Sequence, residues 1–341
     1  MRFLPTLALP KRALPTLALA LGLVCTSLAQ PALSQEARWD VINEYPASSL
    51  PGEADSFFAE AVKAKAAGKL TINPIPDAKS GLRTREQLKA VSDGRFAMAN
   101  SFGGALGDEA PLFLLSSLPF VTASTADAKA LYDAARPLYE SLFAARGQKL
   151  LYISPWPPSG IWSAAPLKDL AALKALKIRT YDKTGTEVLA QVAASAGIVS
   201  FSDLNPKLDS GEINAVLSSG DGGAGRQLWK YTLNFSEILY AVPLSFASVS
   251  LEAWQKLDTA TQAAVEAAAA ETSEHQWQAM SGRVAINYKR MRDNGVTIDE
   301  APPKEVMDAL RAAAAQSVAQ WKATADPAAQ QVLTDFLARP R

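Results

Sequence analysis

Between residues 39 and 154, stretches with two different patterns of apolar residues alternate along the chain. Some stretches are short and rich in β-branched and aromatic residues, which is typical of strands. Longer amphipathic stretches with the period of a helix lie between them. We predict strands over 39–45, 70–75, 94–100 and 149–154, and helices over 51–67 and 84–92. Strands that alternate with helices along the chain predict an α/β fold.

The second half of the chain predicts a long helix. Residues 258–292 are rich in alanine, glutamate and glutamine and contain no proline, which favours one continuous helix. A last helix is expected to begin after residue 303, with Pro327 breaking it. The densest proline cluster, Pro155 to Gly160, predicts a crossover between two domains.

The N-terminal residues predict export from the cytoplasm. Basic residues precede an apolar run over 13–24, and small residues then offer cleavage after Ala29 or Ser34. We therefore expect a secretory signal peptide over residues 1–34 and a periplasmic protein. The run is too short to span a bilayer, which weighs against the alternative of a permanent anchor.

The net charge and the cysteine content of the chain argue against some functions and structural features. Removal of residues 1–34 leaves 31 basic and 34 acidic side chains, a net charge of −3, and no cysteine. Binding to nucleic acid is not expected, because it requires a basic stripe for phosphate contacts. No disulfide can form, and about 300 remaining residues are more than a single core usually holds, which suggests two domains.

The sequence contains few residues suited to catalysis or to a cofactor. His275 is the only histidine, so neither a histidine–cysteine pair nor a zinc cluster is available after cleavage, and we expect no metal and no cofactor. Hydrolysis by two carboxylates stays open, because it needs only two acids. The glycine-rich run over 220–225 lacks the Lys-Ser/Thr ending of a P-loop, so a flexible loop along a cleft is favoured over a nucleotide site.

The most informative stretch runs from Ala165 to Ser219. Its short apolar strand ends at Arg179, whose guanidinium presents a planar fork of donors that matches a carboxylate. A helix-like run, an aromatic–acidic segment with Phe201 and Asp203, and the motif over 211–215 follow in order. This order resembles the DctP-type solute-binding proteins of TRAP (tripartite ATP-independent periplasmic) transporters.

The resemblance implies a two-domain periplasmic binding protein fold of the α/β class, with a ligand cleft between the domains and a long helix that spans both. It places residues 36–157 and 246–290 in domain I, and residues 158–245 and 291–341 in domain II. It also implies that Phe201 lies against the bound solute.

We expect six residues to bind the ligand, and Arg179 is the principal one. The others are Phe201, Ser218, Trp156, Trp162 and Asp203. Each has an ordinary alternative: a surface ion pair for the arginine, core packing for the aromatic residues, and a helix cap for Asp203. Ser218 stands where the family usually carries asparagine, which makes the pocket less polar.

These features predict a receptor that binds a small organic carboxylate and delivers it to the membrane subunits of a TRAP transporter. The protein is expected to act as a monomer and not as an enzyme. The aromatic side chains favour a compact monocarboxylate over a hydroxyl-rich sugar acid, whose polar groups would lack partners. A secreted carboxylate-dependent hydrolase and an ABC-type solute receptor are the alternatives.

Overall fold

Two separate β-sheets organise the chain. In the computed structural model, residues 3–4, 37–122, 124–193 and 195–339 are described, so the predicted signal peptide lies almost entirely outside the described residues. The first sheet has the strand order β2-β1-β3-β10-β4. Its strands are β1 (Ala37–Ile42), β2 (Leu70–Ile75), β3 (Met98–Phe102), β4 (Gln148–Pro155) and β10 (Leu244–Ser250). β1 pairs parallel with β2 and β3, whereas β10 pairs antiparallel with β3 and β4.

The second sheet has the order β11-β9-β5-β8-β6-β7. Its strands are β5 (Ser159–Ser163), β6 (Lys177–Thr180), β7 (Ser195–Ile198), β8 (Ala215–Ser219), β9 (Asn234–Ser236) and β11 (Thr297–Asp299). The chain leaves the first sheet at Pro155 and enters the second at Ser159, so the crossover at the proline cluster is confirmed. The first and second domains are named here by these sheets.

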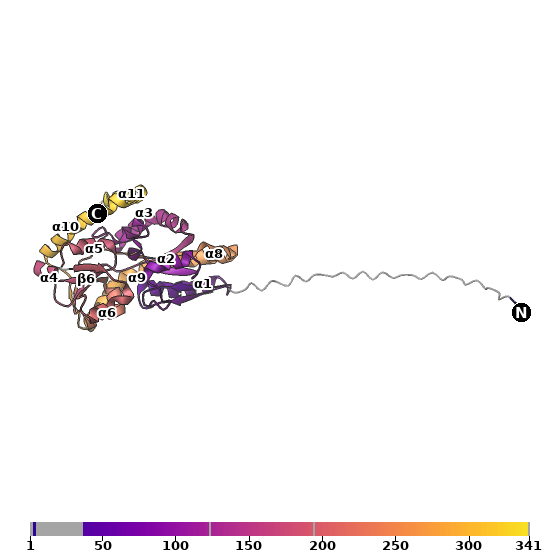
Figure 1. The fold of residues 1–341 in the computed structure, drawn as a ribbon, viewed down its shortest axis with the longest axis horizontal. Helices are drawn as coiled ribbons and strands as arrows, with labels where there is room; N and C mark the ends of the chain where they lie inside the picture. Colours follow the sequence, from indigo (N-terminus) through magenta and orange to yellow (C-terminus); the bar gives the residue numbers. More distant parts are fainter. Residues whose placement is uncertain (1–2, 5–36, 123, 194, 340–341) are drawn as a thin grey trace. The chain divides into compact units, whose positions relative to one another are not determined.

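Helices surround both sheets (Figure 1). The longer ones are α1 (Leu50–Lys65), α2 (Thr84–Ser92), α3 (Thr125–Ala144), α5 (Lys183–Ala190), α9 (Thr259–Asp293), α10 (Lys304–Thr324) and α11 (Pro327–Leu337). The shorter α-helices are α4 (Leu170–Lys174), α6 (Leu204–Asp209), α7 (Gly220–Arg226) and α8 (Leu251–Gln255). Short 3₁₀-helices cover Gly103–Leu106, Pro111–Ser117, Phe201–Asp203 and Leu228–Lys230.

The long helix α9 contacts both domains. It packs on α1, α3 and β4 of the first domain and on α7 and β11 of the second. Asp258 caps its first turn by accepting a hydrogen bond from the Thr261 amide at 2.7 Å, and Arg290 and Arg292 complement the dipole at its last turn. The predicted α/β fold with a long helix is therefore confirmed.

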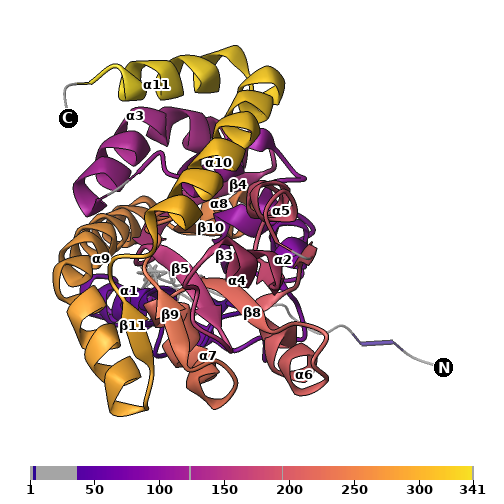
Figure 2. The same ribbon diagram turned by 90° about the vertical axis from the view of Figure 1, so that its left-hand side faces the viewer.

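The C-terminal helices also reach both domains (Figure 2). α10 lies against α4 and α5, and α11 lies against α3 of the first domain. The side chains of Trp321, Leu333 and Phe336 join the same buried cluster as Tyr139 and Phe143, which explains the position of α11. This finding differs from the expectation that all of residues 291–341 lie in domain II, and the exact domain boundaries stay a prediction. The predicted break at Pro327 is confirmed: α10 ends at Thr324, and Pro327 opens the next helix, α11, at a first-turn position where its missing N–H costs nothing.

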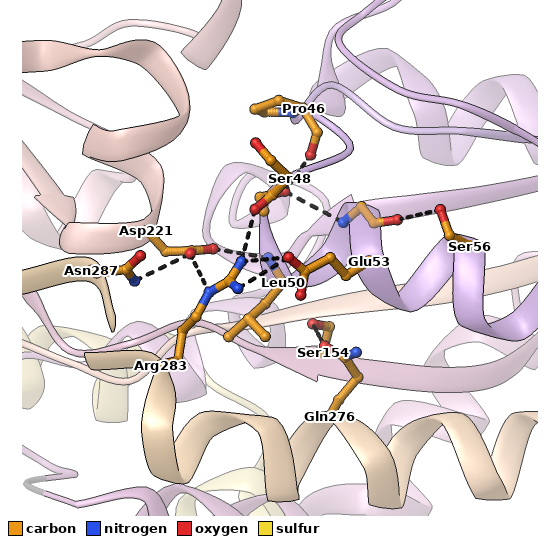
Figure 3. A network of polar contacts seen from close by, with 12 residues as sticks. Pro46, Ser48, Leu50, Glu53, Ser56, Ser154, Asp221, Gln276, Arg283 and Asn287 are labelled. Carbon is orange, nitrogen blue, oxygen red and sulfur yellow. Dashed lines mark hydrogen bonds and ion pairs between the residues drawn. The ribbon is translucent and has the colours of Figure 1, made fainter. Parts of the chain in front are cut away.

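A network around Arg283, in the C-terminal half of α9, joins three helices (Figure 3). The Arg283 Nε donates to Asp221 Oδ1 at 2.6 Å, and its two terminal nitrogens each donate to Glu53 at 3.0 Å. Asp221 also accepts from the Leu50 amide at 2.8 Å and from Asn287 at 3.2 Å. The network therefore connects α1 of the first domain to α7 of the second through α9.

The Arg283 network generates a stability prediction. The Asp221 side chain is 2 % exposed, whereas that of Glu53 is 44 % exposed. We expect Asp221→Ala to lower the free energy of unfolding by about 3–5 kcal/mol, since it leaves a largely buried guanidinium without its nearest partner. Glu53→Ala should cost less than about 1 kcal/mol, because water screens an exposed partner. Chemical denaturation checks both values, and equal losses would contradict this assignment.

Candidate functional site

A small cavity lies between the two domains. Tyr45, Phe102 and Trp156 line it from the first sheet and the segments next to it. The remaining lining residues are Ser159, Arg179, Tyr181, Phe201, Ser218, Ser219, Gly222 and Pro243. The side chains leave about 20 Å³ of free space between them, far below the roughly 300–1,000 Å³ of small-molecule sites, so a solute enters only if the lining residues or the domains move apart.

A larger depression lies elsewhere, between α3, β4 and α9. Its cations all pair with carboxylates: Lys129 with Asp133, Arg136 with Glu140, and Lys149 with Glu266. Among the described residues it thus offers an anion no unpaired cation, whereas the cavity between the domains does, and we take the latter as the candidate site.

Among the described residues that line the cavity, Arg179 is the only charged one. It lies near the end of β6, between β7 and β8, and is 3 % exposed. Its Nε donates to the Val199 carbonyl at 2.9 Å and its Nη1 to the Leu217 carbonyl at 3.1 Å. Among the described residues, no carboxylate forms an ion pair with it and Nη2 has no hydrogen-bond partner. Burial lowers the pKa of Arg179, because the charged form loses hydration.

Aromatic side chains surround the arginine. The Tyr45 ring lies 4.4 Å from that of Phe201 and 4.6 Å from that of Trp156, between ring centres. Trp156 Nε1 donates to Ser245 Oγ at 2.9 Å, which fixes the ring and satisfies its only polar atom. The cavity therefore combines one cationic group with apolar walls.

A few hydroxyl groups complete the lining. Tyr181 donates to Ser159 Oγ at 3.3 Å. In the part of the chain that the structure describes, neither the Tyr45 hydroxyl nor the Ser218 hydroxyl has a recorded partner. Burial raises the pKa of Tyr45 well above its usual range, so this hydroxyl stays protonated and can donate.

The structure brings together four of the residues expected to bind the ligand: Arg179, Phe201, Ser218 and Trp156. Trp162 does not line the cavity. Its ring packs against Phe235 at 5.3 Å, and its Nε1 donates to the Ser219 carbonyl at 3.2 Å. This fully buried side chain lies behind the wall formed by β8 and α7, so it supports the cavity from outside.

Asp203 is also placed outside the cavity. Its carboxylate receives two hydrogen bonds from Arg83 of the first domain, at 2.8 and 2.9 Å. Its hydrogen bonding therefore joins the two domains. The sequence alone does not reveal this partner, which lies 120 positions away.

The glycine-rich run over 220–225 forms most of α7, so the prediction of a flexible loop is wrong. Ser219 caps the helix by accepting from the Gly222 amide at 3.1 Å. The reason for the glycines is close packing: a Cβ on Gly223 would lie 2.1 Å from the Trp162 ring, and one on Gly222 would lie 2.5 Å from Ser218 Oγ.

Several lining residues were not predicted, chiefly Tyr45, Tyr181 and Ser159. Tyr45 follows β1 and Tyr181 directly follows β6, and both strands belong to parallel pairs. Ligands of open α/β sheets bind beyond the carboxyl ends of such strands. That rule, applied to the predicted strands, would have identified both tyrosines.

Two α/β domains, with a small and largely apolar cavity between them whose described lining holds one arginine without an ion pair, are the architecture expected of a solute-binding protein. A model of the DctP family, "bacterial extracellular solute-binding protein, family 7", matches residues 43–324. The chain belongs to this family. Within the described residues, we find no helix with the length and apolar character needed to cross a membrane.

Solved structures show the same fold. DctP7 of Bordetella pertussis, an extracytoplasmic solute receptor that binds pyroglutamic acid, has a TM-score of 0.84 and 28 % identity, over 88 % of this chain and 99 % of that one. DctP6 of the same organism, also described as binding pyroglutamic acid, has a TM-score of 0.84 and 26 % identity, over 89 % and 100 %. A TRAP periplasmic solute-binding protein of Xanthobacter autotrophicus with bound β-D-galacturonate has a TM-score of 0.80 and 17 % identity, over 89 % and 100 %. A comparison with curated protein sequences found no match.

The packing of α7 generates the second prediction. We expect Gly223→Ala to lower the free energy of unfolding by about 1–3 kcal/mol or more, because the new methyl group overlaps the Trp162 ring. Gly282→Ala in α9 is the control: a Cβ there has no atom within 4 Å, so we expect a gain of about 0.5–1 kcal/mol from helix propensity. Denaturation of both variants is the measurement. A neutral Gly223→Ala would argue against the packed helix.

Proposed function

We propose that this protein is a periplasmic receptor that binds a compact organic monocarboxylate at Arg179 and delivers it to the membrane subunits of a TRAP transporter. The observation that carries this proposal is a buried guanidinium with no carboxylate partner among the described residues. A buried charge is costly unless it is paired and hydrogen-bonded. A solute carboxylate would supply the missing partner.

The free donors support this type of ligand. Arg179 Nη2 carries two N–H groups, and the Tyr45 and Ser218 hydroxyls also lack recorded partners among the described residues. A carboxylate with two oxygens can accept from the guanidinium and from a neighbouring hydroxyl. The wall of Tyr45, Trp156 and Phe201 rings would then cover the apolar body of the solute.

The cavity favours a solute with few polar groups besides the carboxylate. A sugar acid carries several hydroxyls, and each hydroxyl left without a partner would cost about 1–3 kcal/mol. The two related receptors at 26–28 % identity are described as binding pyroglutamic acid, a compact cyclic acid of this kind. We therefore propose pyroglutamate or an acid of similar size and polarity as the solute.

The hydrolase alternative receives no support from the cavity. Hydrolysis by two carboxylates requires a pair of acidic side chains beside the substrate. In the part of the chain that the structure describes, no Asp or Glu lines the cavity between the domains. A receptor role also agrees with the family, whose members are solute-binding proteins. We propose that the protein acts as a monomer.

A thermal-shift screen tests the choice of solute. A ligand that binds only the folded protein raises its stability by about 2.7 kcal/mol at a concentration 100 times its Kd. We expect pyroglutamate, or a branched or aromatic monocarboxylate, to raise the melting temperature and to remain chemically unchanged. Stabilisation by uronic or sialic acids, with none by compact acids, would contradict the proposed solute class. Chemical conversion of the ligand would instead support a hydrolase.

The role of Arg179 generates a separate prediction. We expect Arg179→Ala to weaken solute binding by about 2–5 kcal/mol, because the solute carboxylate loses its charged partner inside the cavity. Arg179→Lys should restore only part of the loss, since a point charge cannot reproduce the two-point contact.

Isothermal calorimetry with the best acid of the screen is the measurement. Lys177→Ala is the matched control: this exposed lysine lies in the same strand and does not line the cavity, so wild-type affinity is expected. Wild-type affinity of Arg179→Ala would remove Arg179 from the site.

A further inference from the structure

Glu44 forms hydrogen bonds to both domains beside the cavity. This carboxylate follows β1 and is 2 % exposed. Within the first domain, one of its oxygens accepts from the Thr84 amide at 2.8 Å and from the Thr84 hydroxyl at 2.7 Å. Its other oxygen accepts from the Ser202 amide at 2.9 Å and from the Ser202 hydroxyl at 3.1 Å, in the second domain. Half of its hydrogen bonds therefore exist only when the domains lie together.

The residues next to Thr84 and Ser202 form a second contact between the domains. Arg83 precedes Thr84, Asp203 follows Ser202, and their side chains form the two-point ion pair described above. Arg83 also lowers the pKa of Asp203, so the carboxylate is charged at neutral pH. Because the two side chains are 48 % and 39 % exposed, water and salt weaken this pair.

These contacts flank two rings of the solute cavity. Glu44 precedes Tyr45, and Ser202 follows Phe201, so the hydrogen bonds hold the two rings in contact at 4.4 Å. The Arg226 guanidinium lies 4.7 Å from the centre of the Phe201 ring and also pairs with Asp77 of the first domain at 3.1 Å. Glu44 itself does not line the solute cavity; it borders a smaller recess beside Arg179.

We propose that Glu44, Ser202, Arg83 and Asp203 form a clasp that holds the two domains closed around the solute, and that Glu44 is its principal residue. The clasp residues are positioning residues, because they act through Tyr45 and Phe201 and do not touch the solute. Opening the domains breaks the two contacts to Ser202, which are charge-assisted and protected from water. The clasp should therefore slow the release of any solute, whatever its chemistry. Its effect on affinity depends on the proposed receptor function, but its effect on domain closure does not.

Spin labels on the two domains test the clasp without any solute. Lys79 is an exposed residue of the first domain, and Asp209 is an exposed residue of the second. The chain has no cysteine after position 25, so one cysteine introduced at each of these two positions can be labelled. We expect Glu44→Gln to shift the distance distribution of the unliganded protein to longer values. The amide nitrogen of glutamine cannot accept hydrogen bonds, so the donors of either Thr84 or Ser202 lose their acceptor. Asp93→Asn is the matched control, since it removes an exposed ion pair, to Lys89, within a single helix. It should leave the distribution unchanged.

Stopped-flow kinetics with the best acid of the screen is the second readout. We expect Glu44→Gln to raise koff about ten-fold and Asp203→Asn about two- to five-fold, with kon within about two-fold of wild type. Ser202→Ala, which removes one cross-domain hydrogen bond and nothing within the first domain, should raise koff while the melting temperature stays near that of wild type. It keeps the proposal testable if Glu44→Gln does not fold.

Unchanged distances and unchanged koff in Ser202→Ala and Asp203→Asn would overturn the clasp. A screen in which no carboxylate binds would contradict the proposed function instead, and the distance measurement would still decide the clasp.

Discussion

The buried charge of Arg179 is the constraint on which the candidate site depends. The guanidinium lies in β6, next to the edge strand β7 of the second sheet, where burial removes it from water and lowers its pKa. Two backbone carbonyls accept from it, but no carboxylate of the described residues forms an ion pair with it. An anion bound in the cavity would complete this group, and we propose that the apolar walls keep the paired charges away from water.

The fold places the other parts of the site through long-range contacts. The ends of β1, β6 and β8 bring Tyr45, Arg179 and Ser218 to one cavity although they are far apart in the sequence. The glycines of α7 let that helix pack directly on Trp162 and leave room beside Ser218. The Arg283 network connects this wall to α1 and α9, so the two domains share one buried polar contact away from the clasp. In the proposed scheme, binding and closure are separate: Arg179 binds the anion, and Glu44 with its hydrogen-bond partners links the domains.

Much of the fold could be predicted because it depends on local patterns. The strand at 70–75, the helix at 84–92, the long helix and the crossover after Pro155 follow from periodicity and proline positions. Arg179 could be predicted because a strand, a planar cation and a family motif coincide. Trp162 could not be placed, since the burial of a strand residue depends on which helix covers that face, and α7 covers it. Asp203 could not be placed either, because its partner Arg83 comes from the other domain. The glycine run was misleading for the same reason, since its packing partner is a distant tryptophan.

The most direct test of the central claim is a crystal structure of the protein with pyroglutamate, or with the acid that stabilises it most. The account predicts that the solute lies between Tyr45, Trp156 and Phe201, with its carboxylate within about 3 Å of the Arg179 guanidinium. A solute bound in this cavity with its carboxylate turned away from Arg179, or bound only in the depression between α3, β4 and α9, would contradict the account.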